Sequence, residues 1–223
     1  KVYGFDGLFP RTIRDLTIRS GKVSRLYIRG NRVLYYRPVG YFFLVVTVLF
    51  IFMGLLGVNV TEYMKAAAGG MGVQQARAGS GQERLTTSIL QVASENLKWV
   101  SFMMVPFQAF CSRYLFFRKS GLNFLEHNVL PLYLQGHLYW LMVIEVIYFK
   151  WSGHALSQAV TVVMLLYYGF PYADLIDYQS RIKAFLKGVG VCIAAQVILM
   201  MVFFIVLVVL ILTLPEFREM VRP

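Results

Sequence analysis

The feature that most constrains the fold is the apolar run from Val189 to Leu214, which contains no charged residue. A helix needs about 20 consecutive apolar residues to cross the hydrocarbon core of a bilayer. Composition agrees, because 58% of the residues are apolar or aromatic and 15% are charged, whereas soluble domains carry about a quarter charged residues. The chain is therefore predicted to be an all-α polytopic membrane protein.

Five such apolar segments divide the chain. Transmembrane helices are predicted at about 39–58, 99–117, 128–149, 155–173 and 189–214, which together form a membrane domain over residues 38–223. Residues 1–37 form a basic interfacial segment, and residues 59–98 form the one sizeable external loop.

The loop 59–98 has two parts of different composition. Residues 66–82 are rich in Ala, Gly and Gln and are expected to be flexible. Between Glu83 and Leu97 the apolar residues recur at near-helical spacing, which predicts a helix that either extends the second span or lies on the outer surface.

The basic residues predict the orientation. With the N-terminus in the cytoplasm, 15 of the 22 Lys and Arg lie on the cytoplasmic side and 7 lie on the other. Because short cytoplasmic loops carry the excess of basic residues, we expect the N-terminus inside and the C-terminus outside.

The segment before the first span alternates Arg with apolar residues, a pattern typical of a helix or strand lying at the membrane interface. Arg25, Arg29, Arg32 and Arg37 lie within the last 13 residues of it. They either enforce topology and hold the segment on anionic lipid, or form a headgroup site, since guanidinium groups bind phosphate in a bidentate manner. We expect a bound phospholipid and predict no cofactor.

Two strings resemble a known family. The sequence RLYIRGNRVLYYRPVGYFFL contains the pattern R-x-Y-I-x-G-x-R-x-x-Y-x-x-P, and NFLEH precedes the third span. Both resemble motifs of the uncharacterised bacterial membrane family called domain of unknown function 3667. The resemblance implies a multi-pass protein of the bacterial cytoplasmic (inner) membrane with no established activity, and it directs attention to Arg25, Arg32, Glu126 and His127.

Ionisable groups at membrane depth are costly, so each should have a partner or a task. Glu126, Tyr133 and His137 fall on one stripe of the third span, which should face other helices. Glu145 lies farther along the same span and need not join them.

The expected topology brings Glu126, His127, Asp174 and Asp177 to the depth at which the arginine segment enters. Glu126 and Asp174 are then either counter-ions that clamp this segment or, with a titrating histidine, part of a headgroup-binding or proton-handling site.

Catalytic and metal chemistry have little support in the sequence. Cys111 and Cys192 lie in apolar spans and are interpreted as structural. The three histidines lack metal-ligand spacing, and no nucleotide-binding or nucleophile motif occurs. We assign no catalytic residue and no metal site, so an enzyme is unsupported.

The sequence is compatible with three functions. The first is an accessory or structural subunit of a larger inner-membrane assembly, with other integral subunits and membrane lipids as partners and no nucleic acid. The second is a small oligomeric transporter or channel, lined by the Glu126, His137 and Glu145 helix. The third is a protein that binds lipid headgroups through its arginine segment.

Overall fold

The computed structural model describes residues 7–70 and 81–213, and every regular element in these two ranges is a helix. In chain order, the helices are α1 (Leu8–Ile28), α2 (Pro38–Leu55), α3 (Val60–Gly70), α4 (Gly81–Glu95), α5 (Leu97–Phe110), the π-helical turn η1 (Cys111–Phe116), α6 (Phe124–Ser152), α7 (Ser157–Leu175) and α8 (Arg181–Thr213). The expected all-α class is therefore confirmed.

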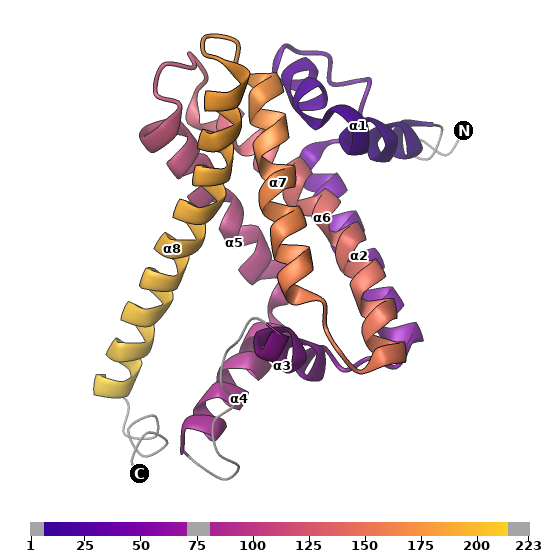
Figure 1. The fold of residues 1–223 in the computed structure, drawn as a ribbon, viewed down its shortest axis with the longest axis vertical. Coiled ribbons are helices and arrows are strands. Elements are labelled where there is room, and N and C mark those ends of the chain that lie inside the picture. Colours follow the sequence, from indigo (N-terminus) through magenta and orange to yellow (C-terminus); the bar gives the residue numbers. More distant parts are fainter. Residues whose placement is uncertain (1–6, 71–80, 214–223) are drawn as a thin grey trace.

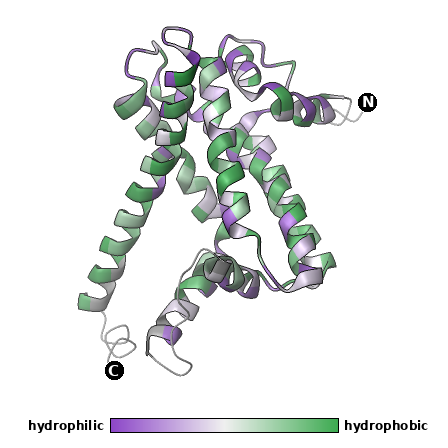
Figure 2. Cartoon of the chain, in the orientation of Figure 1, coloured by the Kyte–Doolittle hydropathy of each residue, from purple (hydrophilic) through white to green (hydrophobic). Residues whose placement is uncertain are grey.

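Three of these helices are long and apolar enough to cross a membrane: α2, α6 and residues Arg181–Val206 of α8. Helices α5 and α7 run between the same two ends of the molecule, whereas α1 lies across one end and α3 and α4 lie at the other (Figure 1). Apolar residues dominate the long helices between the two ends (Figure 2).

Helix α6 is the centre of the bundle because its opposite faces enter two separate apolar clusters. Tyr133, Tyr139 and Val146 pack with buried residues of α1, α2 and α3. Leu130 and Leu134, one helical turn apart, pack with η1, α7 and α8. This arrangement ties the N-terminal half of the chain to the C-terminal half.

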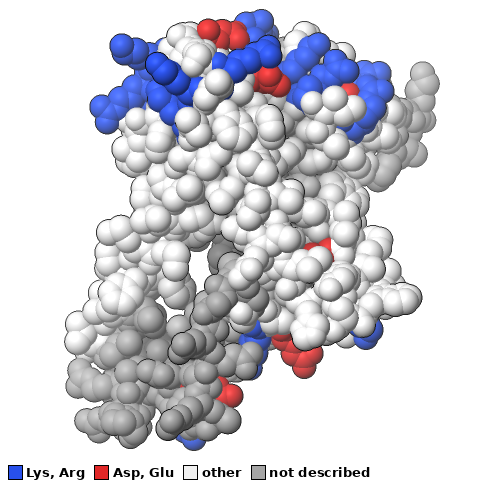
Figure 3. All heavy atoms as spheres, in the orientation of Figure 1, with Lys and Arg blue, Asp and Glu red and all other residues white. Residues whose placement is uncertain are grey.

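Charged residues lie at the two ends of the bundle, with Lys and Arg gathered densely at the end that carries α1 (Figure 3). Three segments contribute to this basic end: α1 with the loop after it, the loop between η1 and α6, and the start of α8. An almost uncharged belt separates the two ends (Figure 3).

Two helix boundaries differ from the expected spans because of local capping. Helix α6 begins at Phe124, where Asn123 and Glu126 form a reciprocal capping box. Helix α8 begins at Arg181, since the backbone N–H of Lys183 donates to Ser180 Oγ at 3.4 Å and that of Ala184 donates to the Ser180 carbonyl at 3.0 Å.

The described parts of the loop 59–98 are largely helical. The expected helix between Glu83 and Leu97 is present as α4, and a break at Asn96 separates it from α5. The segment expected to be flexible is helical at its start, because α3 extends to Gly70 and its alanines favour a helix. Residues 71–80 of that segment lie outside the described part of the chain.

Candidate functional site

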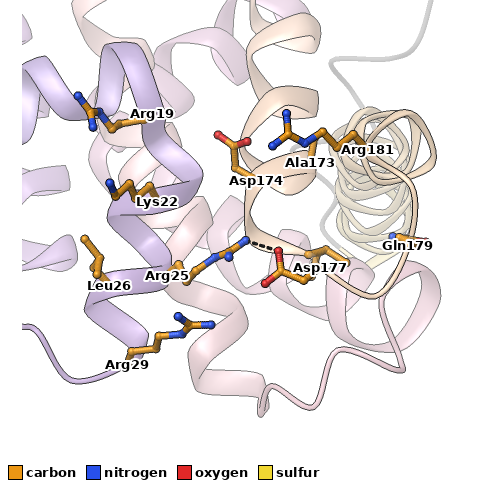
Figure 4. Close-up of a pocket in the computed structure, with 11 residues that line it drawn as sticks. Arg19, Lys22, Arg25, Leu26, Arg29, Ala173, Asp174, Asp177, Gln179 and Arg181 are labelled. Atoms are coloured by element: carbon orange, nitrogen blue, oxygen red, sulfur yellow. Dashed lines mark hydrogen bonds and ion pairs between the residues drawn. The ribbon is translucent and has the colours of Figure 1, made fainter.

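A cleft of about 520 Å³ lies at the basic end, between the second half of α1, the end of α7 and the start of α8 (Figure 4). Five cations and two carboxylates line it: Arg19, Lys22, Arg25, Arg29 and Arg181, with Asp174 and Asp177. The lining therefore carries an excess of three positive charges. The start of α8 adds the partial positive charge of a helix N-terminus.

The cations of α1 share one side of the helix because of their spacing. Lys22, Arg25 and Arg29 follow one another at three and four residues, which places them on one helical face. Arg19 has non-helical backbone angles, φ −151° and ψ 53°, and kinks α1 just before this face begins. Helix α1 and its C-cap therefore line the cleft with a row of cations, of which Arg25 and Arg29 reach toward α7 (Figure 4).

Gly21 permits the close approach of α1 to α7 that forms one wall of the cleft. A Cβ atom built at this position would lie 2.3 Å from the carbonyl oxygen of Pro171 and 2.6 Å from Cβ of Asp174. Tyr167 of α7 reinforces the contact by donating to the carbonyl oxygen of Leu16 at 3.0 Å.

One ion pair crosses the cleft. The Arg25 guanidinium donates to Oδ1 of Asp177 at 2.7 Å, and Figure 4 shows the arginine reaching from α1 to the loop after α7. The Asp177 side chain is 67% exposed. A pair this exposed contributes about 0–1 kcal/mol, so another anion can replace Asp177 at little cost.

A smaller cavity of about 280 Å³ adjoins the cleft and shares Arg25, Arg29, Ile176 and Asp177 with it. Its remaining lining consists of Ile28, Leu122, Leu175 and Tyr178, together with the cation Lys119 and with Ser120. The two cavities therefore meet at the two arginines.

Of the predicted arginines, Arg25 and Arg29 line the cleft and the other two do not. Arg32 lies over the Tyr27 ring, with its guanidinium carbon 5.8 Å from the ring centroid. Arg37 precedes α2, and its carbonyl oxygen accepts the backbone N–H of Tyr41 at 2.8 Å.

The predicted acidic and histidine partners are divided between several places. Asp174 lines the cleft. Glu126 instead accepts the backbone N–H of Asn123 at 2.7 Å and caps α6. His127 is buried, with Nδ1 2.7 Å from Ser112 Oγ and Nε2 3.0 Å from Ser120 Oγ, so it fastens η1 and the following loop to α6.

Tyr133 and His137, predicted to face other helices, both contact the N-terminal segment. Tyr133 donates to the carbonyl oxygen of Tyr36 at 2.6 Å. The His137 ring lies 2.9 Å from the Tyr41 hydroxyl and 3.1 Å from Thr17 Oγ1 through its two nitrogens. These contacts hold α1 and the loop after it against α6.

Glu145 is separate from this group, as expected. Its side chain is buried, and its Oε2 accepts the Tyr63 hydroxyl at 2.8 Å. Oε1 has no hydrogen-bond partner among the described residues. The pair attaches α3 to α6 near the end of the bundle opposite the cleft.

Besides Arg19, Lys22 and Arg181 of the cleft, the sequence reasoning missed Asp15, which anchors the loop before α2. Its Oδ1 accepts Arg14 Nε at 2.9 Å and its Oδ2 accepts the Tyr35 hydroxyl at 3.1 Å. Burial raises the pKa of Asp15, but these two donors and the positive charges of Arg14 and Arg19 outweigh burial and lower it below the ordinary 3.8. Its isolation could have indicated a role, since only Asp6 and Asp15 are acidic before the first span.

The cleft has the chemistry of an anion site. Four arginines and a lysine line a space large enough for a phosphate-bearing group, and guanidinium groups bind phosphate in a bidentate manner. Within residues 7–70 and 81–213, no group of three or more His, Cys, Asp or Glu side chains is placed to share a metal ion.

Comparison with known proteins identifies one family. Residues 6–50 match the model of a family described as protein of unknown function (DUF3667), which confirms the resemblance carried by the arginine motif. The matched range includes the cations that α1 contributes to the cleft. No curated protein and no solved structure matches the chain.

Proposed function

We propose that this chain, with its match to that uncharacterised family, is a multi-pass membrane protein that binds an anionic lipid headgroup in the cleft between α1, α7 and α8. The observation that carries the proposal is that five cations line one cleft at the end of an apolar bundle. Only two carboxylates oppose them. Cation clusters at this level recognise the phosphates of membrane lipids.

The position of the cleft favours a lipid over a soluble anion. The basic end borders directly on the uncharged belt (Figure 3), and Leu26 and Ile176 contribute apolar surface to the cleft itself. A headgroup anchored by its chains in a bilayer would therefore meet these cations without leaving the membrane.

The proposal includes the membrane topology. Three helices have the length and hydropathy of spans, and α7 together with the α5–η1 segment, which run parallel to them, would supply two more (Figure 1). The basic end would face the cytoplasm of a bacterium, with the N-terminus inside, the C-terminus outside and the inner membrane as the location.

Cysteine labelling tests this orientation. Ser120→Cys lies in the loop at the basic end, and Ser152→Cys lies at the end of α6. In intact cells, a membrane-impermeant maleimide should label the cysteine at 152 and spare the one at 120. Labelling at 120 alone would reverse the orientation, and labelling of both would contradict the five-span arrangement.

Lipid retention tests the binding function. Protein extracted in mild neutral detergent is analysed by native mass spectrometry for bound anionic phospholipid of any class, comparing Lys22→Gln/Arg29→Gln with the control Arg32→Gln. All three side chains are exposed or half-exposed on the same segment, but Arg32 lies outside the cleft. We expect the double variant alone to lose anionic lipid. Equal retention in all forms would refute the cleft as the site.

A second function, an accessory subunit of a larger assembly, is favoured by α8. Its last buried residue in the described range is Ala195, and beyond it Met200 and Phe204 are 71% and 64% exposed. This half of α8 stands away from the bundle (Figure 1) and could pack against a membrane-embedded partner. Stoichiometric co-purification of another polypeptide, lost on Met200→Ala/Phe204→Ala, would support it, and a bare monomer would refute it.

A further inference from the structure

We infer that the ligand of the cleft is a lipid whose headgroup ends in a terminal phosphate, a phosphomonoester or diphosphate, and not a phosphodiester lipid. The inference rests on the proposed headgroup-binding function and specifies its ligand class. Two features of the described residues carry it: the charge of the cleft, and the apolar side chains in the wall of the cavity beside it.

The positive charge of the cleft determines how much negative charge on a ligand it can neutralise. Its lining has an excess of three positive charges while Asp177 occupies Arg25. A phosphodiester headgroup supplies one negative charge, whereas a terminal phosphate supplies about 1.5 to 2 and three acceptor oxygens. A diphosphate supplies more. Only a terminal phosphate or a diphosphate carries enough negative charge to approach the positive charge of the lining.

The geometry provides more than one contact for such a phosphate. Arg25 and Arg29 reach from α1 toward the wall formed by α7 and α8, and Arg181 extends from the first turn of α8 on that opposite wall (Figure 4). Donors on two walls can each bind a different oxygen of a terminal phosphate. A phosphodiester offers only two unesterified oxygens, because the other two carry carbon.

The ion pair between Arg25 and Asp177 fits the same ligand. Asp177 presents a carboxylate to the cleft in the way that a phosphate oxygen would. Because the carboxylate is largely exposed, a phosphate with greater charge would displace it from Arg25 and gain a stronger charge-assisted hydrogen bond.

The adjoining cavity indicates where the lipid chain goes. It opens from the cleft at Arg25 and Arg29, and its wall includes Ile28, Leu122 and Leu175. A phosphate held by the two arginines would place its first methylene groups against these apolar side chains. Inorganic phosphate or pyrophosphate would satisfy the cations and leave this cavity unused.

A titration followed by native mass spectrometry tests the inference on the whole chain in neutral detergent. The probes are dioctanoyl phosphatidic acid as the phosphomonoester, dioctanoyl phosphatidylglycerol as the phosphodiester, and inorganic pyrophosphate as the anion without a chain. We expect phosphatidic acid to bind at least about tenfold more tightly than phosphatidylglycerol, the ratio expected for one additional charged hydrogen bond.

Matched variants assign the preference to the cleft. Arg29→Gln should reduce the preference for phosphatidic acid by about tenfold, whereas Arg32→Gln should leave it unchanged. Leu122→Gln should weaken the binding of phosphatidic acid and leave the binding of pyrophosphate unchanged. Each variant must match the elution profile and unfolding temperature of the unmodified chain.

The possible results distinguish failure of the terminal-phosphate specificity from failure of the proposed headgroup binding. Equal affinity for both lipids, lost in Arg29→Gln, would overturn the terminal-phosphate specificity and leave headgroup binding intact. Pyrophosphate binding as tight as phosphatidic acid, with no effect of Leu122→Gln, would make the ligand a soluble anion. Binding that no cleft variant changes would overturn both.

Discussion

Replacing Gly21 by alanine should separate α1 from α7 and open the cleft. The added Cβ would lie 2.3 Å from the Pro171 carbonyl oxygen and 2.6 Å from Asp174 Cβ. Neither atom is the end of a flexible side chain, so the clash can be relieved only by moving one helix against the other.

The expected magnitude follows from two opposing effects. Alanine in place of glycine favours a helix by about 1 kcal/mol, whereas overpacking a tight contact costs about 1 to 3 kcal/mol. Because the obstructing atom belongs to the backbone, the cost should lie at or above the upper end. The net loss of about 2 kcal/mol corresponds to a fall of roughly 4 to 8 °C in Tm for a chain of this size.

Thermal unfolding in detergent, followed by tryptophan fluorescence, measures this loss. The control is Gly54→Ala on α2, where a Cβ would meet no atom within 4 Å and Tm should stay constant or rise slightly. Gly21→Ala should also lose anionic lipid. An unchanged Tm together with unchanged lipid retention would refute the packing of α1 on α7 and, with it, the cleft.

Three further expectations concern hydrogen bonds away from the cleft. The pKa of Asp15 is lowered in the folded protein, so its carboxylate stabilises the fold fully above about pH 3.8, and this contribution is lost as the pH falls below that value. Asp15→Asn should therefore lower Tm at pH 7. The same variant should make Tm less dependent on pH between 5 and 3. Glu126→Gln should leave Tm nearly unchanged, because Gln can still accept in the capping box of α6, whereas Asn123→Ala should cost about 1 kcal/mol; equal losses in denaturation experiments would contradict this. Tyr63→Phe should cost about 1 to 3 kcal/mol by leaving the buried Glu145 without its donor, and a neutral result in the same assay would show that α3 does not depend on this bond.

The apolar composition made the long elements predictable. Each of the five expected spans overlaps one of α2, the α5–η1 segment, α6, α7 and α8, because a long apolar segment has few alternatives to a helix. The boundaries were less accessible. The string NFLEH was noticed as a motif, but its physical role as a capping box that starts α6 depends on the backbone turning at Asn123.

The candidate site was predictable only in part. The clustering of arginines before the first expected span indicated Arg25 and Arg29, and the expected position of Asp174 at the same membrane boundary indicated that residue. The contributions of Arg19, Lys22 and Arg181 depend on the kink in α1 and on the path of the chain from 176 to 180. Helical periodicity encodes neither feature, and it also does not show the close approach of Gly21 to Pro171 that places α1 beside α7.

The half of α8 beyond Ala195 makes little contact with the rest of the bundle, and this affects how its sequence can change over time. If lipid surrounds it, any apolar residue serves at each position, and related chains should diverge there while preserving only length and hydropathy. If a protein partner covers it, the residues on one face of the helix, spaced three to four apart, should be conserved, whereas the residues on the opposite face should vary. The record of substitutions along this one helix would therefore reveal its neighbour.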